Sequence, residues 1–163
     1  MNESIGKFVQ VGLLTPHPKN PRRNDQAVES IANSIKRFGF TSPIIANKDQ
    51  TILCGHTRYK AARSLGLSVV PVIYVDLSPV DAELLMIADN KLGELSEWNT
   101  NQLSELLVEL REQGEDLDVL GFEQDELTSI LNINFDFNDI DPIEDESELK
   151  QTKLCPHCGG ELD

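Results

Sequence analysis

The most informative part of this chain reads TILCGHTRYKAARSLG, residues 51–66. Its first four residues form a short apolar run that predicts a strand, and Gly55 ends this strand with a turn. The spacing of apolar residues from about Arg58 to Leu65 is helical, and Gly66 stands where a helix would stop. The pattern therefore predicts a strand, a glycine turn and a helix whose start is basic.

A helix start of this kind is suited to bind an anion. The first N–H groups of a helix have no partner within it, and the helix dipole places partial positive charge at the same end. Arg58 adds a forked pair of donors that matches phosphate oxygens. A phosphate site is one interpretation of this turn. The other is that Gly55 only supplies a positive φ and that Arg58, Lys60 and Arg63 form a solvated face.

The composition predicts one ordinary domain with an appended segment. The chain has 163 residues, of which 39% are hydrophobic, so it can bury a core. It contains no apolar run of the length of a membrane span, and its first residues lack the basic and apolar regions of a signal peptide. Three cysteines, two of them in one Cys-x-x-Cys, fit a reducing compartment, and we expect a cytoplasmic protein.

The net charge of −14 is divided unevenly along the chain. Residues 1–75 carry ten Lys and Arg against four Asp and Glu, a net charge of +6, whereas residues 76–163 carry four against twenty-four, a net charge of −20. A basic N-terminal half is compatible with the phosphates of a nucleotide or of DNA, and an acidic C-terminal half would repel a duplex. Any contact with DNA is therefore expected in the first half.

The rest of the N-terminal part alternates predicted strands and helices. Strands are expected near residues 8–11, 43–47 and 69–75, and helices over about residues 25–38 and 78–90. Pro71 lies within the last of these strands and suggests that this strand is at an edge of the sheet. Asn24 or Asp25 is the expected N-cap of the first helix.

Several motifs of this part occur in a fixed order. They are LTPHPKNPR at residues 14–22, FG at 38–39, PII at 43–45, GHTRYKAA at 55–62 and VPV at 70–72. Together they resemble the ParB/sulfiredoxin superfamily, specifically the ParB N-terminal (ParB-like nuclease) domain, over about residues 8–95. The resemblance implies an α/β fold of the α+β type, in which a small mixed sheet packs against helices and a helical extension follows.

The resemblance also implies a site for CTP or ATP with Mg²⁺. The residues that it places at the nucleotide are Gly55 and Arg58 at the phosphates with the first amides of the helix, His56 and Thr57 lining the pocket, Arg22 or Arg23 from the preceding loop, and Thr41 and Ser42 near the base. ParB proteins that bind CTP have Glu-Asn-x-x-Arg in a later helix. Asp89 and Asn90 stand at the first two of these positions, with Asn90 the expected Mg²⁺ ligand, but Gly93 replaces the arginine and weakens the expected triphosphate clamp.

The chain is divided into four expected parts. They are a ParB/sulfiredoxin-like domain (1–95), a helical extension (96–133), an acidic flexible linker (134–152) and a Cys-x-x-Cys tail (153–163). Cys155 and Cys158 have the spacing of half a zinc ribbon, with His157 as a third candidate, so zinc would need ligands from another chain. Cys54 is expected to be a small buried residue.

Three classes of function are open on the sequence. The first, which we favour, is a nucleotide-dependent DNA transaction: DNA binding, a partition-type switch, or a role accessory to DNA modification in a mobile element or phage. A homodimer is among the assemblies expected for this class. The second is an enzyme, either a nucleotide triphosphatase, a kinase or another phosphotransferase, or a nuclease, with His56 and Asp89 as candidate acid–base residues. Sulfiredoxin activity is not expected, because His56 stands at the catalytic cysteine position. The third is a non-catalytic adaptor whose acidic helices recruit a protein partner.

Overall fold

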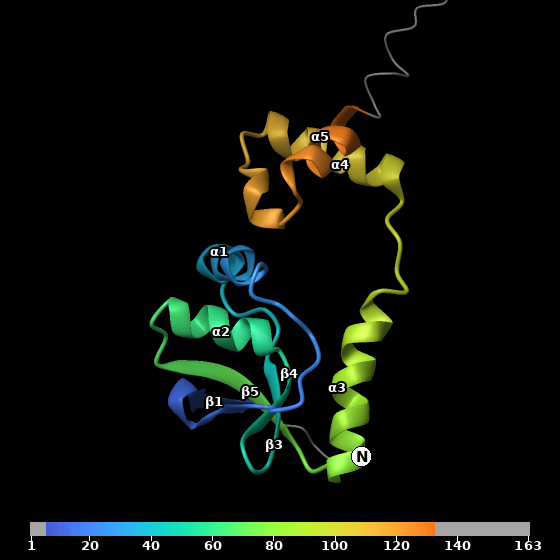
Figure 1. Cartoon of the computed structure of the whole chain (residues 1–163). Coiled ribbons are helices and arrows are strands. Elements are labelled where there is room, and N and C mark those ends of the chain that lie inside the picture. Colours follow the sequence, from blue (N-terminus) through green and yellow to red (C-terminus); the bar gives the residue numbers. More distant parts are fainter. Residues whose placement is uncertain (1–5, 133–163) are drawn as a thin grey trace, which may run out of the picture.

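The structure is a computed structural model that describes residues 6–132, and its centre is a five-stranded sheet (Figure 1). The strands are β1 (Gly6–Gln10), β2 (Thr15–Pro16), β3 (Ile44–Asn47), β4 (Thr51–Cys54) and β5 (Val69–Val75). They lie in the order β1-β5-β3-β4-β2. The pairs β1–β5 and β3–β4 are antiparallel, and the pairs β3–β5 and β2–β4 are parallel. The predicted mixed sheet is confirmed.

Five α-helices and two short 3-10 turns complete the described part of the chain. They are η1 (Val11–Leu13), α1 (Val28–Phe38), α2 (His56–Ser64), α3 (Pro79–Gly93), α4 (Thr100–Glu112), η2 (Leu117–Leu120) and α5 (Gln124–Asn132). The helix after the glycine turn begins at His56, two residues before the expected Arg58. Among residues 6–132 no helix has both the length and the apolar character needed to cross a membrane.

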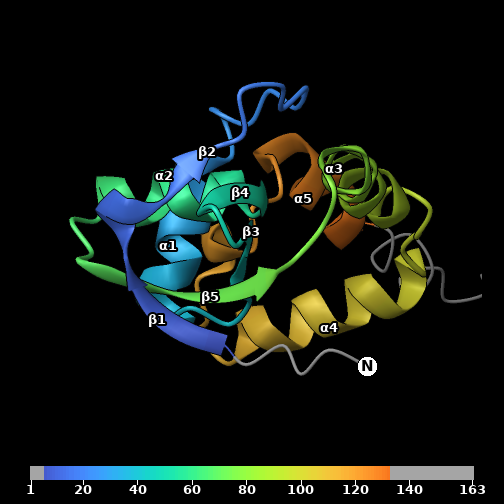
Figure 2. The same ribbon diagram turned by 90° about the horizontal axis from the view of Figure 1, so that it is seen from below.

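α2 and α3 pack against opposite faces of β4, and Figure 2 shows α1 and α2 on one side of the sheet with α3 beside it. α2 lies on one face with α1 stacked on its outer side, while α3 runs beside β4. Ile52 of β4 packs with Tyr59 and Ala62 of α2, whereas the next residue, Leu53, packs with Ala82 of α3. Because successive residues of a strand point to opposite faces, β4 contributes to both cores. The turn after β4 therefore emerges between α2 and α3.

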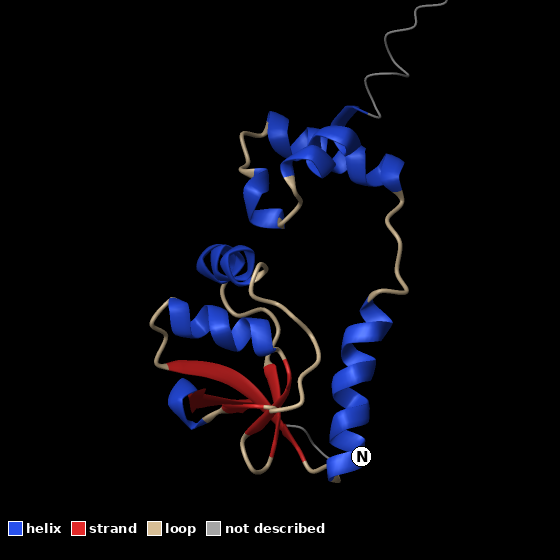
Figure 3. Cartoon of the chain, viewed as in Figure 1, coloured by secondary structure: helices blue, strands red, loops and turns tan. Residues whose placement is uncertain are grey.

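The helical extension forms a lobe with its own core. Leu107, Leu127 and Ile130 are buried together between α4, η2 and α5. η2 contacts α1, and Arg37 of α1 forms an ion pair with Glu115, which follows α4. Figure 3 shows this lobe beyond α1, on the side away from the strands.

The expected edge position of β5 is wrong, because β5 pairs with both β1 and β3. Pro71 is opposite Phe8 of β1, and the register with β3 begins one residue later, at Val72. A proline cannot donate a ladder hydrogen bond. The strand accommodates Pro71 in the interior of the sheet because the ladder to β3 starts only after it.

The expected N-cap of α1 is also wrong. Ala27 occupies the N-cap and makes no side-chain cap bond. The side-chain oxygens of Asn24 and Asp25 instead accept hydrogen bonds from Nζ of Lys60, at 2.7 and 2.6 Å. The ammonium of Lys60 takes the oxygens that would otherwise cap the helix, and it ties the preceding loop to α2.

Candidate functional site

A small pocket lies where the glycine turn meets the loop before α1 and the last turns of α3. Gly55, His56, Thr57 and Arg58 line it from the turn and α2, Asn20, Arg22 and Asn24 from the loop, Ile31 from α1, and Asp89 and Asn90 from α3. Its volume is about 140 Å³, below the roughly 300–1,000 Å³ of pockets that enclose a small-molecule ligand. The pocket suits a phosphate-sized group, and a larger ligand would extend out of it.

Gly55 is required at the turn for two reasons. Its φ of 93° lies in the left-handed region, which residues with a side chain rarely adopt. A Cβ atom at this position would also lie 2.9 Å from Nη2 of Arg58, whose guanidinium folds back over the turn. Nη2 of Arg58 donates to the carbonyl oxygen of Pro43 at 3.1 Å. The glycine therefore makes room for the arginine as well as for the bend.

The first turn of α2 presents donors to the pocket. The N–H of Tyr59 donates to the carbonyl oxygen of Gly55 at 2.9 Å, so the N–H groups of His56, Thr57 and Arg58 precede the helical ladder. Nε of Arg58 is buried and has no hydrogen-bond partner within residues 6–132. Main-chain and guanidinium donors thus gather at the positive end of α2, which is the arrangement that binds phosphate.

His56 is buried at the start of α2 and contacts the loop before α1. Its Nε2 accepts a hydrogen bond from the main-chain N–H of His17, with a distance of 3.2 Å between the nitrogens. Burial lowers the pKa of His56 to about 4, and electrostatic repulsion by the basic side chains of His17 and Lys60 acts in the same direction. The imidazole is therefore neutral at neutral pH.

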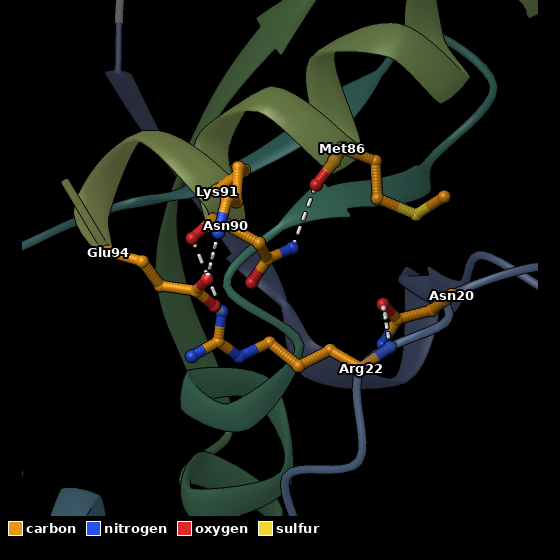
Figure 4. A network of polar contacts seen from close by, with 6 residues as sticks. All are labelled: Asn20, Arg22, Met86, Asn90, Lys91 and Glu94. Carbon is orange, nitrogen blue, oxygen red and sulfur yellow. Dashed lines mark hydrogen bonds and ion pairs between the residues drawn. The ribbon is translucent and has the colours of Figure 1, made fainter.

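Arg22 reaches from the loop to the C-terminal end of α3 (Figure 4). Its Nη1 lies 3.3 Å from the main-chain oxygen of Asn90 and 3.2 Å from Oε1 of Glu94, and its main-chain N–H donates to Oδ1 of Asn20 at 3.3 Å. Lys91 also pairs with Glu94, at 2.9 Å. Lys91 and, to a smaller extent, Arg22 lower the pKa of Glu94, so this carboxylate is ionised.

Asp89 and Asn90 bring side-chain oxygens to the pocket. Nδ2 of Asn90 donates to the main-chain oxygen of Met86 at 2.8 Å, which leaves Oδ1 as the acceptor of the amide. Mg²⁺ prefers oxygen ligands and is often held by one or two side chains together with phosphate oxygens and water. Within residues 6–132 no three His, Cys, Asp or Glu residues gather as a metal cluster. Mg²⁺ at this place would therefore depend on phosphate oxygens for part of its coordination.

Cys54 ends β4 beside this site, with 2% of its surface exposed. Burial raises the pKa of its thiol to about 12, and the charge of Asp89 and a hydrogen bond to it act in the same direction. Because the thiolate is the nucleophilic form of cysteine, Cys54 is inert at neutral pH. This agrees with the expected small buried residue. The other two cysteines, Cys155 and Cys158, lie outside the described residues, so their role in zinc binding stays a prediction.

The remaining predicted contacts are not at the pocket. Arg23, Thr41 and Ser42 are exposed and are not among the residues that line it, and their role at a nucleotide stays a prediction. Asn20 and Asn24 line the pocket but were not assigned to it from the sequence. The only signal for them was their place beside Arg22 in the proline-rich loop.

The N-terminal part of this chain is similar in sequence to known proteins. The family model of the ParB N-terminal domain matches residues 1–90. A probable chromosome-partitioning protein ParB of Campylobacter jejuni is 30% identical over 94 residues, which are 55% of this chain and 30% of that protein. The ParB-like nuclease domain-containing protein YnaK of Escherichia coli is 38% identical over 61 residues, 37% of this chain and 70% of that protein.

A solved structure shares the fold. The C-terminally truncated chromosome-partitioning protein ParB of Caulobacter crescentus, complexed with CTP-gamma-S, has a TM-score of 0.66 and 20% identity, over 80% of this chain and 78% of that one. The chain spans about a third of the length of the curated partitioning proteins that it matches. The family model covers more than half of this sequence. The chain therefore belongs to the ParB N-terminal domain family.

Proposed function

We propose that this protein binds a nucleoside triphosphate, CTP or ATP, with Mg²⁺ in the pocket at the start of α2, and that binding serves a DNA transaction. The observation that carries the proposal is that Arg58, Arg22 and the first turn of α2 line one small pocket together with Asp89 and Asn90 of α3. Such a pocket offers donors to phosphate and oxygens to a cation that accompanies it.

The size of the pocket suggests how a nucleotide would lie. A phosphate group fits against the start of α2, and the base and ribose extend towards the surface. Gly93 offers no side chain at the position of the family's arginine, so Arg22 is the second guanidinium available to the phosphates. The likeness of the fold to a ParB that was solved with CTP-gamma-S supports a nucleotide as the ligand.

DNA is the second partner of the proposed function. The pocket lies mainly in the half of the chain that carries a net charge of +6, whereas the second half carries −20. Basic residues bind the DNA backbone through its phosphates. The names of the partitioning relatives support a partition-type role, and a role accessory to DNA modification is the alternative within the same class.

The first prediction tests the phosphate site with two arginines of α2. Arg58→Ala should weaken the binding of the preferred nucleotide at least about tenfold, because hydrogen bonds to charged groups contribute about 1.5–3 kcal/mol each. Arg63→Ala removes the same charge from an exposed position outside the pocket and should leave affinity within about twofold, as expected for a screened surface charge. Calorimetric titration with CTP, ATP, GTP and UTP in Mg²⁺ measures both.

Repeating the titration in a chelator and with duplex DNA tests the rest of the proposal. Affinity should fall without Mg²⁺ and should change when DNA is present. Equal affinity of the Arg58→Ala and wild-type proteins would overturn the phosphate site, and a folded wild-type protein that binds none of the four nucleotides would overturn the proposed function.

A further inference from the structure

The loop from His17 to Asn24 holds three of the pocket residues, Asn20, Arg22 and Asn24, and is attached to the rest of the protein in few ways. The main-chain N–H groups of Lys19 and Arg22 donate to side chains of the same loop, which are Nδ1 of His17 and Oδ1 of Asn20. Its ion pairs with other elements are made by the long side chains of Lys19, Arg22 and Lys60, all at least 40% exposed. At the Asn24 end, Nζ of Lys60 also donates to Oδ1 of the buried Asn24 at 2.7 Å. Exposed ion pairs hold a loop weakly.

At its other end, at His17, the loop is held by a hydrogen bond to a buried ring. The main-chain N–H of His17 donates to Nε2 of His56, a ring that is only 8% exposed and sits on the first turn of α2. Burying a donor or acceptor without its partner costs about 1–3 kcal/mol, so a shielded bond resists opening more than an exposed pair does. This bond fixes the loop that carries Arg22 to the start of the phosphate-binding helix.

The same bond determines which nitrogen of His56 carries the proton. A neutral imidazole has one N–H donor and one lone pair, and here the lone pair of Nε2 accepts from His17. The proton is therefore on Nδ1. Because His56 lines the pocket, Nδ1–H is the only hydrogen-bonding group that the ring can still offer to an anion there. A general base needs a lone pair facing the ligand, and this ring has none to spare.

We propose that His56 is a positioning residue. Its Nε2 accepts the hydrogen bond from His17 and so holds the loop from His17 to Asn24 against α2, while its Nδ1–H donates to the bound phosphate. The second half of this inference rests on the proposed nucleotide site, and the first half does not. His56 thus links the loop that carries Arg22 to the start of α2, and it takes no part in proton transfer.

Three substitutions distinguish the roles of the two ring nitrogens of His56. Gln places an amide oxygen near the position of Nε2, so His56→Gln keeps an acceptor for His17. Asn places an amide group near the position of Nδ1, so His56→Asn keeps a donor for the ligand and loses the bond to the loop. His56→Ala loses both. Each variant is compared with the wild-type full chain by circular dichroism to establish that it is folded.

The loop is measured without any nucleotide. Hydrogen exchange of the His17 amide, followed by NMR, should be protected in the wild-type protein and about tenfold or more faster in His56→Ala and His56→Asn, with His56→Gln close to wild type. Long-range ¹H–¹⁵N correlation of the His56 ring should show a proton on Nδ1 only. An unprotected His17 amide, equal exchange in wild type and His56→Ala, or a proton on Nε2 would overturn the inference.

Calorimetry with CTP and with ATP in Mg²⁺ then tests whether Nδ1–H of His56 donates to the bound nucleotide. His56→Ala should weaken the tighter-binding nucleotide about tenfold, and His56→Gln and His56→Asn should each recover part of that loss. Unchanged affinity in His56→Ala would overturn the proposed donor. If the wild-type protein binds neither nucleotide, the proposed function fails, but protection of the His17 amide still decides the positioning role of His56. Arg58→Ala is the control for that measurement and should retain the protection of the His17 amide.

Discussion

His56 shows how a single buried residue can be assigned a role from its contacts. Its ring is shielded from solvent, and two neighbouring basic side chains, His17 and Lys60, add to the cost of charging it. A neutral ring with one nitrogen already engaged is a fixed pair of hydrogen-bonding groups. Gly55 and Arg58 also depend on each other: because Gly55 has no side chain, the guanidinium of Arg58 has room to lie over the turn.

The low pKa of His56 predicts a loss of stability in mild acid. The unfolded side chain titrates near 6.5 and the folded one near 4, so the unfolded state binds more protons between these values. The contribution of His56 to the free energy of unfolding is therefore largest above pH 6.5 and falls, by on the order of 3 kcal/mol, as pH falls towards 4. His56→Gln lacks this titration, and chemical denaturation of both proteins from pH 4 to 7.5 isolates it. Parallel pH profiles of the two proteins would contradict the prediction.

At the scale of elements, the C-terminal end of α3 holds Arg22 through Glu94. A phosphate in the pocket would compete with this carboxylate for the same guanidinium. Both side chains of the pair are about half exposed, so the ion pair contributes little binding energy to Arg22 and is sensitive to salt. The contact therefore limits nucleotide affinity only modestly.

We predict that Glu94→Gln tightens nucleotide binding by roughly two- to fivefold at low salt, because Arg22 is released from a weak surface pair. Glu97→Gln is the matched control, since it removes one negative charge from the same exposed segment without an ion pair in the described structure. Calorimetric titration at two salt concentrations measures the effect. A gain of equal size in both variants would mean that general charge, and not the contact with Arg22, is responsible.

The sequence predicted the elements better than the contacts between them. β4, the glycine turn and α2 were predicted because an apolar run, a glycine and a helical spacing are local signals. β2 was missed because its two residues become a strand only by pairing with β4. The bonds from Arg22 to Glu94 and from His17 to His56 join residues 72 and 39 positions apart, and no local pattern encodes such contacts.

At the scale of the whole molecule, the protein has separate cores. The cluster around β3, β5 and α2 shares no buried residue with the cluster of the helical lobe. The lobe is joined to α1 by the contact with η2 and by the exposed Arg37–Glu115 pair, which adds little stability. Helical units this small are marginal without support from a larger core. The lobe should therefore open more easily than the sheet.

Leu107→Ala tests this separation, because Leu107 is 1% exposed in the core of the lobe. Truncation of a buried leucine costs about 2–5 kcal/mol, so amide exchange in α4 and α5 should accelerate strongly while exchange in β3 and β5 is nearly unchanged. Leu106→Ala, on the same helix but 52% exposed, is the matched control and should change little. Nucleotide binding should persist in both variants, since no residue of the lobe lines the pocket in the described structure. Equal acceleration of amide exchange in the sheet and in the lobe would show instead that the two cores unfold as one cooperative unit. The contact between the lobe and α1 would then have to be much stronger than its exposed ion pair suggests.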